Sequence, residues 1–93
     1  MTASAPAPRL RVRTASSTYL VDLEEGWISR QPGEDSAALR YDTERITLVG
    51  MRRPMVLGHP MVLVLSGLAT SGALTIRLTT PVVEIAPVER GET

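Results

Sequence analysis

Apolar and polar residues alternate along several short stretches of the chain, which is the pattern of strands that place one face on a core. Arg9–Thr14 is the first such stretch, and it directs Leu10 and Val12 toward the core. The opposite face of this strand carries Arg9, Arg11 and Arg13. Such charges are typical of a solvated strand face that resists edge pairing, and they also form the pattern of a basic stripe that binds nucleic acid.

The next two stretches, Thr18–Leu23 and Trp27–Gln31, are predicted to form a hairpin. Three residues ending in Gly26 connect them, and glycine suits a last loop position with positive φ. The core face of the hairpin then carries Tyr19, Val21, Leu23 and Trp27, with Leu23 opposite Trp27. Asp22 and Arg30 would share the other face as a weak diagonal ion pair.

The most apolar part of the chain is Met55–Leu65. Within it, Met61–Leu65 lies between Gly58-His59-Pro60 and Ser66-Gly67. A run this short, bounded by turn formers, predicts a strand buried on both faces, which we place at the centre of the sheet. It is far shorter than the roughly 20 apolar residues of a membrane-spanning helix.

The remaining strands are predicted from shorter signals, at Ala38–Tyr41, Arg45–Val49, Ala73–Thr80 and Val82–Ile85. In Ala73–Thr80 the alternation directs Leu74, Ile76 and Leu78 inward. Pro81 predicts a break or a bulge before the last strand.

Eight or nine short strands and no amphipathic helix predict an all-β fold. We expect a single small domain, with an antiparallel meander closed as a small barrel or packed as a sandwich. Residues 9–86 are expected to form this domain, between a disordered segment at 1–8 and a flexible tail at 87–93.

The amino-acid composition predicts the kind of genome that encodes the protein and the cellular compartment in which it acts. The chain has no Lys, Asn or Phe, whose codons are poor in G and C, so a high-GC genome such as that of an actinobacterium or its phage is expected. Without cysteine there is no disulfide framework and no thiolate site. The first residues lack the basic start and apolar core of a secretory signal, so we expect a cytoplasmic protein. Dimerisation would be a natural way to cover the surface of so small a domain.

Charge is unevenly distributed along the chain although the formal net charge is zero. No acidic residue occurs between Arg45 and Val83, and most acids lie between Asp22 and Glu44. This segregation suits a self-complementary dimer or a polar partner. Because Met, Arg and Trp are favoured at interfaces, the candidate protein-binding residues are Met51, Arg52, Arg53 and Trp27. For Trp27, packing in the core is the favoured interpretation, and a role as interface anchor is the alternative.

No motif for catalysis is complete. His59, the only histidine, has no carboxylate near it in sequence that would complete a zinc site. Gly67–Gly72 has the glycine spacing of a phosphate loop but lacks the lysine that must follow. The carboxylate pairs Glu24-Glu25 and Glu34-Asp35 lie in predicted turns, where solvated charges are expected. We therefore predict no enzyme, no cofactor and no metal site.

Several short motifs carry a resemblance. They are Ser17-Thr18-Tyr19, Asp22, Arg30, Gly33, Gly58-x-Pro60-Met61 and Thr79-Thr80-Pro81-Val82-x-x-Ile85. Together they span most of Ser16–Ile85 and resemble a pattern in small proteins of high-GC actinobacteria and of their phages. In size the chain is similar to cryptic early proteins of mycobacteriophages, some of which bind a host protein. The resemblance implies no catalytic or ligand-binding residue.

These observations predict a non-enzymatic interaction module, encoded by a phage or prophage, that binds a host protein. One alternative is a small nucleic-acid-binding barrel that uses Arg9, Arg11 and Arg13, although the aromatic platform usual for single strands is missing. A second alternative is a structural component of a phage particle. No membrane contact is predicted.

Overall fold

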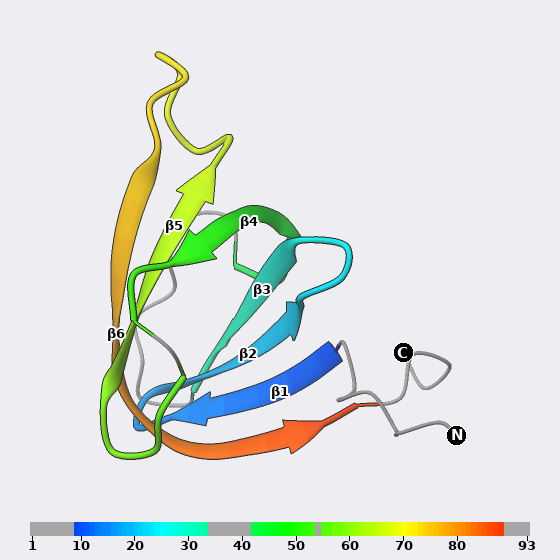
Figure 1. Ribbon diagram of the computed structural model, residues 1–93, viewed down its shortest axis with the longest axis vertical. Coiled ribbons are helices and arrows are strands. Elements are labelled where there is room, and N and C mark those ends of the chain that lie inside the picture. The colour runs from blue at the N-terminus through cyan, green and yellow to red at the C-terminus, as the bar shows by residue number, and fades with distance from the viewer. Residues whose placement is uncertain (1–8, 34–41, 54, 89–93) are drawn as a thin grey trace.

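The computed structural model describes residues 9–33, 42–53 and 55–88, which form one antiparallel sheet (Figure 1). Its strands are β1 (Arg9–Thr14), β2 (Ser17–Asp22), β3 (Trp27–Pro32), β4 (Ile46–Met51), β5 (Pro60–Ser66) and β6 (Thr75–Pro87). Each strand pairs with the next, and β6 also pairs with β1, so the sheet closes into a barrel. The predicted all-β fold, an antiparallel meander closed as a small barrel, is confirmed. The described part of the chain contains no helix long and apolar enough to cross a membrane.

The described residues form six strands, fewer than the pattern predicted. Ala73–Thr80 and Val82–Ile85 belong to the single strand β6, which continues through Pro81. The register of β6 shifts before Pro81 against β5 and after Pro81 against β1, so the predicted irregularity is present. The predicted strand Ala38–Tyr41, the segment 1–8 and the tail beyond residue 88 lie outside the described residues.

All six strands contribute apolar side chains to the inside of the barrel. These are Val12, Tyr19, Val21, Ile28, Leu48, Met61, Leu63, Leu65 and Val82. Along β5, Met61, Leu63 and Leu65 are buried, whereas the residues between them are only half-buried. The prediction that β5 is a central strand buried on both faces is wrong, because a closed barrel gives every strand one inner and one outer face.

The turn between β2 and β3 is one residue longer than predicted. Asp22 pairs with Trp27, and Leu23 joins the turn, where it is exposed. Gly26 has the predicted positive φ, 75°. Because side chains alternate between the two faces, this shift of one residue moves Trp27 from the predicted core face to the outer face.

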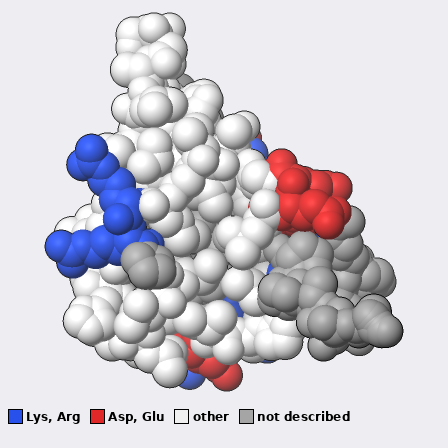
Figure 2. Space-filling view, viewed as in Figure 1, with Lys and Arg blue, Asp and Glu red and all other residues white. Residues whose placement is uncertain are grey.

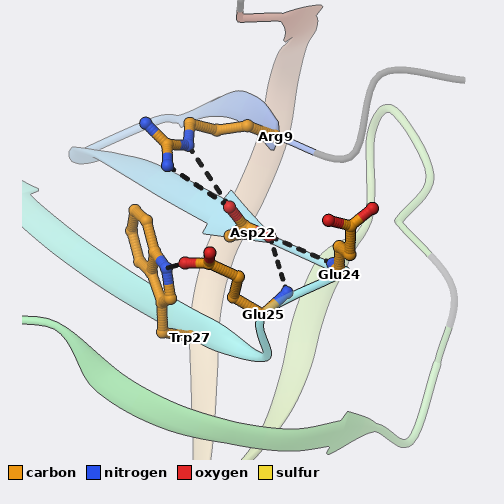
Figure 3. Close-up of polar contacts among 5 residues, drawn as sticks. All are labelled: Arg9, Asp22, Glu24, Glu25 and Trp27. Carbon is orange, nitrogen blue, oxygen red and sulfur yellow. Dashed lines mark hydrogen bonds and ion pairs between the residues drawn. The ribbon is translucent and has the colours of Figure 1, made fainter. Parts of the chain in front are cut away.

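Asp22 explains the longer turn (Figure 3). Its Oδ1 accepts hydrogen bonds from the backbone N–H of Glu24 at 3.0 Å and of Glu25 at 2.8 Å. Its backbone carbonyl accepts one from the Gly26 N–H at 2.8 Å. Its Oδ2 lies 3.4 Å from the Arg9 guanidinium, and Asp22 has no exposed surface. A buried carboxylate is tolerated because these donors satisfy it.

Arg30 lies inside the barrel and connects β3 to the segment that leads into β4. Only Trp27↔Thr47 and Ile28↔Ile46 pair between the two strands. Next to them, Arg30 Nη1 lies 2.8 and 2.7 Å from the two carboxylate oxygens of Asp42, and its carbonyl accepts the Thr43 N–H at 2.8 Å. The predicted Asp22–Arg30 ion pair is therefore wrong, because the longer turn places the two residues on opposite faces.

Candidate protein-binding surface

The outer face of the β5–β6 hairpin is apolar and open. Val62 lies directly opposite Leu78, and Val64 lies opposite Ile76, so the four side chains share one face of the sheet. Leu78 is 69% and Ile76 50% exposed, while both valines are half-buried. We call these four residues the apolar face. It lies on the outer side of the paired part of β5 and β6, the two strands labelled in Figure 1.

The prediction that Leu74, Ile76 and Leu78 point inward is wrong, and the bulge near Pro81 is the reason. Val62 pairs with Leu78 and Pro60 with Pro81, so β6 has one more residue than β5 in this interval. An extra residue exchanges the two faces of a strand from that point on. Val82 and Thr79 are buried, and Ile76 and Leu78 therefore point outward.

Arg52 and Gly50 border the apolar face on the β4 side. The Arg52 N–H donates to the Val62 carbonyl at 2.9 Å, which places Arg52 beside Val62, and its side chain is exposed. Gly50 pairs with Val64, and a side chain there would meet nothing within 4 Å, so the space beside Val64 is open. Val49, in the β4 bulge, is 55% exposed.

An open depression of about 230 Å³ adjoins the apolar face at Pro60, which lies on the same side of β5 as Val62. It is lined by Arg53, Val56, His59 and Pro60. The segment that forms it is fixed to β6, because the Gly58 N–H donates to the Val82 carbonyl at 2.8 Å and the Val82 N–H donates to the His59 carbonyl at 3.0 Å. These hydrogen bonds fix the backbone at His59, which is exposed, beside the apolar face.

The two largest groups of surface charge lie apart on one face of the molecule. In Figure 2 the largest acidic group and the largest basic group lie on opposite sides of the visible face, and most of the described surface between them is uncharged. The projecting end of the β5–β6 hairpin belongs to this uncharged surface. The apolar face is thus flanked by cations on one side and has no carboxylate within the segment from Arg45 to Val83.

Of the predicted protein-binding residues, Arg52 and Arg53 are exposed, and Met51 points inward and packs against the core. Trp27 is 8% exposed. The guanidinium carbon of Arg9 lies 5.1 Å from the centroid of the Trp27 ring, and that of Arg45 lies 4.1 Å from it. The Trp27 Nε1–H donates to Glu25 Oε1 at 3.3 Å. Trp27 is therefore held by cation–π contacts within the molecule, which leaves Arg52 and Arg53 at the surface that a partner can reach.

The predicted basic stripe on β1 is present on the outer face, but most of its charge is neutralised. Arg9 is buried against Asp22, and Arg13 Nε lies 3.2 Å from Glu84 Oε1. Arg11 is exposed and makes no ion pair with a described residue. Phosphate binding depends on the number of cations that meet the backbone, so this face gives the nucleic-acid alternative little support.

Tyr19 is an ionisable residue inside the barrel. Burial raises the pKa of Tyr19 above its usual value of 10.0, and the charges of Arg30 and Arg77 partly offset this effect. The phenol is therefore protonated at neutral pH and cannot act as a base. The described residues contain no group of three side chains suited to a metal ion.

The apolar face was missed in the sequence, although its signal was present. The alternation of residues 74–78 and the irregularity at Pro81 are both visible in the sequence. Their combination determines which side Ile76 and Leu78 face, because one extra residue reverses the alternation. Comparisons with family models, curated proteins and solved structures find no match, and the resemblance to actinobacterial and phage proteins stays a prediction.

Proposed function

We propose that this protein is a non-enzymatic module that binds another protein through the apolar face, with Arg52 and Arg53 at its border. The observation that carries the proposal is the exposure of Ile76 and Leu78 in register with Val62 and Val64. The largest contiguous apolar patch on the surface of a soluble protein is often functional, and large patches of this kind mark interaction sites.

The arrangement of charge around the apolar face supports the same proposal. Protein interfaces have an apolar centre and a polar rim, and arginine is enriched in them. Arg52 lies beside Val62 at the edge of the apolar face, and Arg53 lines the adjoining depression. A partner with apolar side chains and nearby carboxylates is complementary to this surface.

We further propose that the partner is a cytoplasmic protein of a bacterial host. The support is compositional: the chain has no cysteine, and its amino-acid usage is that of a high-GC genome. An origin in a phage or a prophage is what the resemblance implies.

The experiment is affinity capture from an actinobacterial lysate, with and without nuclease, read by mass spectrometry. The bait is the tagged chain, and a second bait carries Ile76→Ser with Leu78→Ser. We expect one host protein that is retained after nuclease treatment by the first bait and lost with the second. Equal retention by both baits would remove the apolar face as the binding site, and material that disappears with nuclease would favour nucleic acid.

A further inference from the structure

One edge of β6 is open along the same hairpin. β6 pairs with β5 from Thr75 to Pro81, but it pairs with β1 only from Val82 to Pro87. No described strand therefore lies beside residues 75–79 on the side away from β5. Figure 1 shows the same arrangement, because no other strand lies outside the upper half of β6.

The backbone groups of Ile76 and Leu78 point toward this open edge. The Val62 carbonyl accepts the Arg52 N–H, so the backbone of Val62 is turned toward β4. In an antiparallel pair the residues that exchange hydrogen bonds alternate along each strand. Leu63 therefore bonds to Arg77 across from it, and the N–H and C=O groups of Ile76 and Leu78, on either side of Arg77, are directed away from β5.

Natural proteins guard such edges with charges, prolines or a covering segment, because unpaired N–H and C=O groups are a template for another strand. Residues 75–79 contain no proline, and their single charge is Arg77. Arg77 is half-buried, lies on the inner side of the hairpin opposite Leu63, and makes no ion pair with a described residue. The edge therefore has hydrogen-bonding groups, apolar side chains and one cation available to a ligand.

We propose that an extended segment of the partner adds to β6 as a further strand at residues 75–79. Its apolar side chains would lie beside Ile76 and Leu78 on the outer face, and an acidic side chain between them would lie beside Arg77 on the inner side. This alternation follows from the period of two along a strand. The inference rests on the proposed function, and it adds the mode of binding and the apolar–acidic–apolar pattern of the partner segment.

A second copy of this chain fits the edge less well. Two β6 strands paired about a two-fold axis at Arg77 would place two guanidinium groups opposite each other, which destabilises the pair. Other registers avoid that contact but supply no carboxylate, because residues 45–83 contain none. Charge complementarity therefore favours a partner segment that carries its own acid.

The test uses the full chain and a random peptide library displayed on phage, followed by synthetic copies of the selected peptides. We expect selected sequences to share an acidic residue between two apolar ones. Replacing that acid by Arg should weaken binding to the native chain at least about tenfold. Arg77→Glu should reverse this preference, so that the Arg peptide binds more tightly than the acidic one.

Backbone pairing is tested in the peptide and in the protein. Methylating successive peptide nitrogens should abolish binding at every second position, since only alternate N–H groups face β6. In the protein, Leu78→Pro and Leu78→Thr both remove the leucine side chain, but only proline also removes the N–H. Proline is tolerated on sheet edges, so the Leu78→Pro chain should still fold. We expect this chain to bind the peptide at least about tenfold more weakly than the Leu78→Thr chain.

The outcomes separate the two proposals. Strand addition would be overturned if Leu78→Pro and Leu78→Thr bind equally well and methylation shows no alternation. If capture of the host protein still requires the Ile76 and Leu78 side chains, the apolar face remains the binding site. Failure to select any peptide, with stable dimers in light scattering that Leu78→Pro dissociates and Leu78→Thr does not, would assign the edge to a second copy. Retention of the host protein by the Ile76→Ser, Leu78→Ser chain would overturn the proposed function itself.

Discussion

Val62 and Leu78 lie directly opposite each other on the outer face of β5 and β6, and Leu78 remains 69% exposed. The pair forms an apolar area on the outside of the barrel, where no described residue covers Leu78. Exposed apolar side chains of this kind lower the solubility of a small domain, and a binding partner that covers them would remove this effect.

Replacing Ile76 and Leu78 by Ser should reduce capture of the host protein at least about tenfold, which corresponds to roughly 1.4 kcal/mol. The free energy of unfolding should fall by only about 1–2 kcal/mol, because each cross-strand pair contributes about 0.2–1 kcal/mol. Capture and urea denaturation measure the two effects. Leu23→Ser is the matched control, since Leu23 is similarly exposed, at 53%, but lies in the β2–β3 turn. A control that loses as much binding would indicate a non-specific apolar effect.

Arg52→Glu combined with Arg53→Glu should abolish binding of the host protein and leave the fold intact. Both side chains are exposed, so their reversal changes the charge beside the apolar face without disturbing the core. Thermal unfolding and quantitative capture measure the two properties. Arg11→Glu, on an exposed position of β1, is the control for a general change in net charge. Unchanged capture by the double variant would remove Arg52 and Arg53 from the site.

Asp22→Ala should lower the free energy of unfolding by about 3 kcal/mol or more, because it leaves the Arg9 guanidinium buried without its carboxylate. It also removes the acceptor of the Glu24 and Glu25 N–H groups. Urea denaturation gives the value. Glu84→Ala removes the exposed pair with Arg13 and should cost less than about 1 kcal/mol. Similar losses in the two variants would contradict a structural role for the buried pair.

Tyr19 should make the stability of the fold decrease in alkali. Its pKa is raised by burial, so above pH 10 the unfolded chain loses the phenolic proton while the folded chain retains it. The folded state then binds more protons, and the free energy of unfolding falls as the pH rises from about 10 toward the raised pKa. Below pH 10 this group contributes no pH dependence. Tyr19→Phe should lack this component in denaturation curves between pH 9 and 11, and identical slopes for the two chains would contradict it.

Gly33→Ala should destabilise the barrel by about 1–3 kcal/mol. A Cβ at this position would lie 2.5 Å from the Ser16 carbonyl oxygen, which also accepts the Gly33 N–H at 2.9 Å. Because both contacts involve backbone, neither side can move easily. Gly50→Ala is the matched control, since a Cβ there meets nothing within 4 Å. Thermal melts of the two variants should differ clearly, and equal melting temperatures would show that the close approach is relieved at little cost.

The sequence by itself determined the class of fold and the position of most strands. Arg9–Thr14 coincides with β1, and Met61–Leu65 lies within β5. The positive φ of Gly26 and the irregularity at Pro81 were also predicted from single residues. These features depend on local alternation and on turn chemistry, which act over a few residues and are therefore visible in the chain.

The sequence also placed Val12, Tyr19 and Val21 on the core side, but only the tertiary structure decided which side of β3 and of residues 75–79 in β6 faces the core. Asp22 accepts hydrogen bonds from two backbone N–H groups of the β2–β3 turn and so lengthens this turn by one residue. The longer turn places Trp27 on the outer face and Arg30 on the inner face. The bulge before Pro81 moves Ile76 and Leu78 outward. In both places one additional residue reverses which face the side chains on one side of it occupy, those after the β2–β3 turn and those before Pro81. The candidate binding site depends on which side chains face outward. Closure of the barrel buries the inner face, so only the outer face is available to a protein partner.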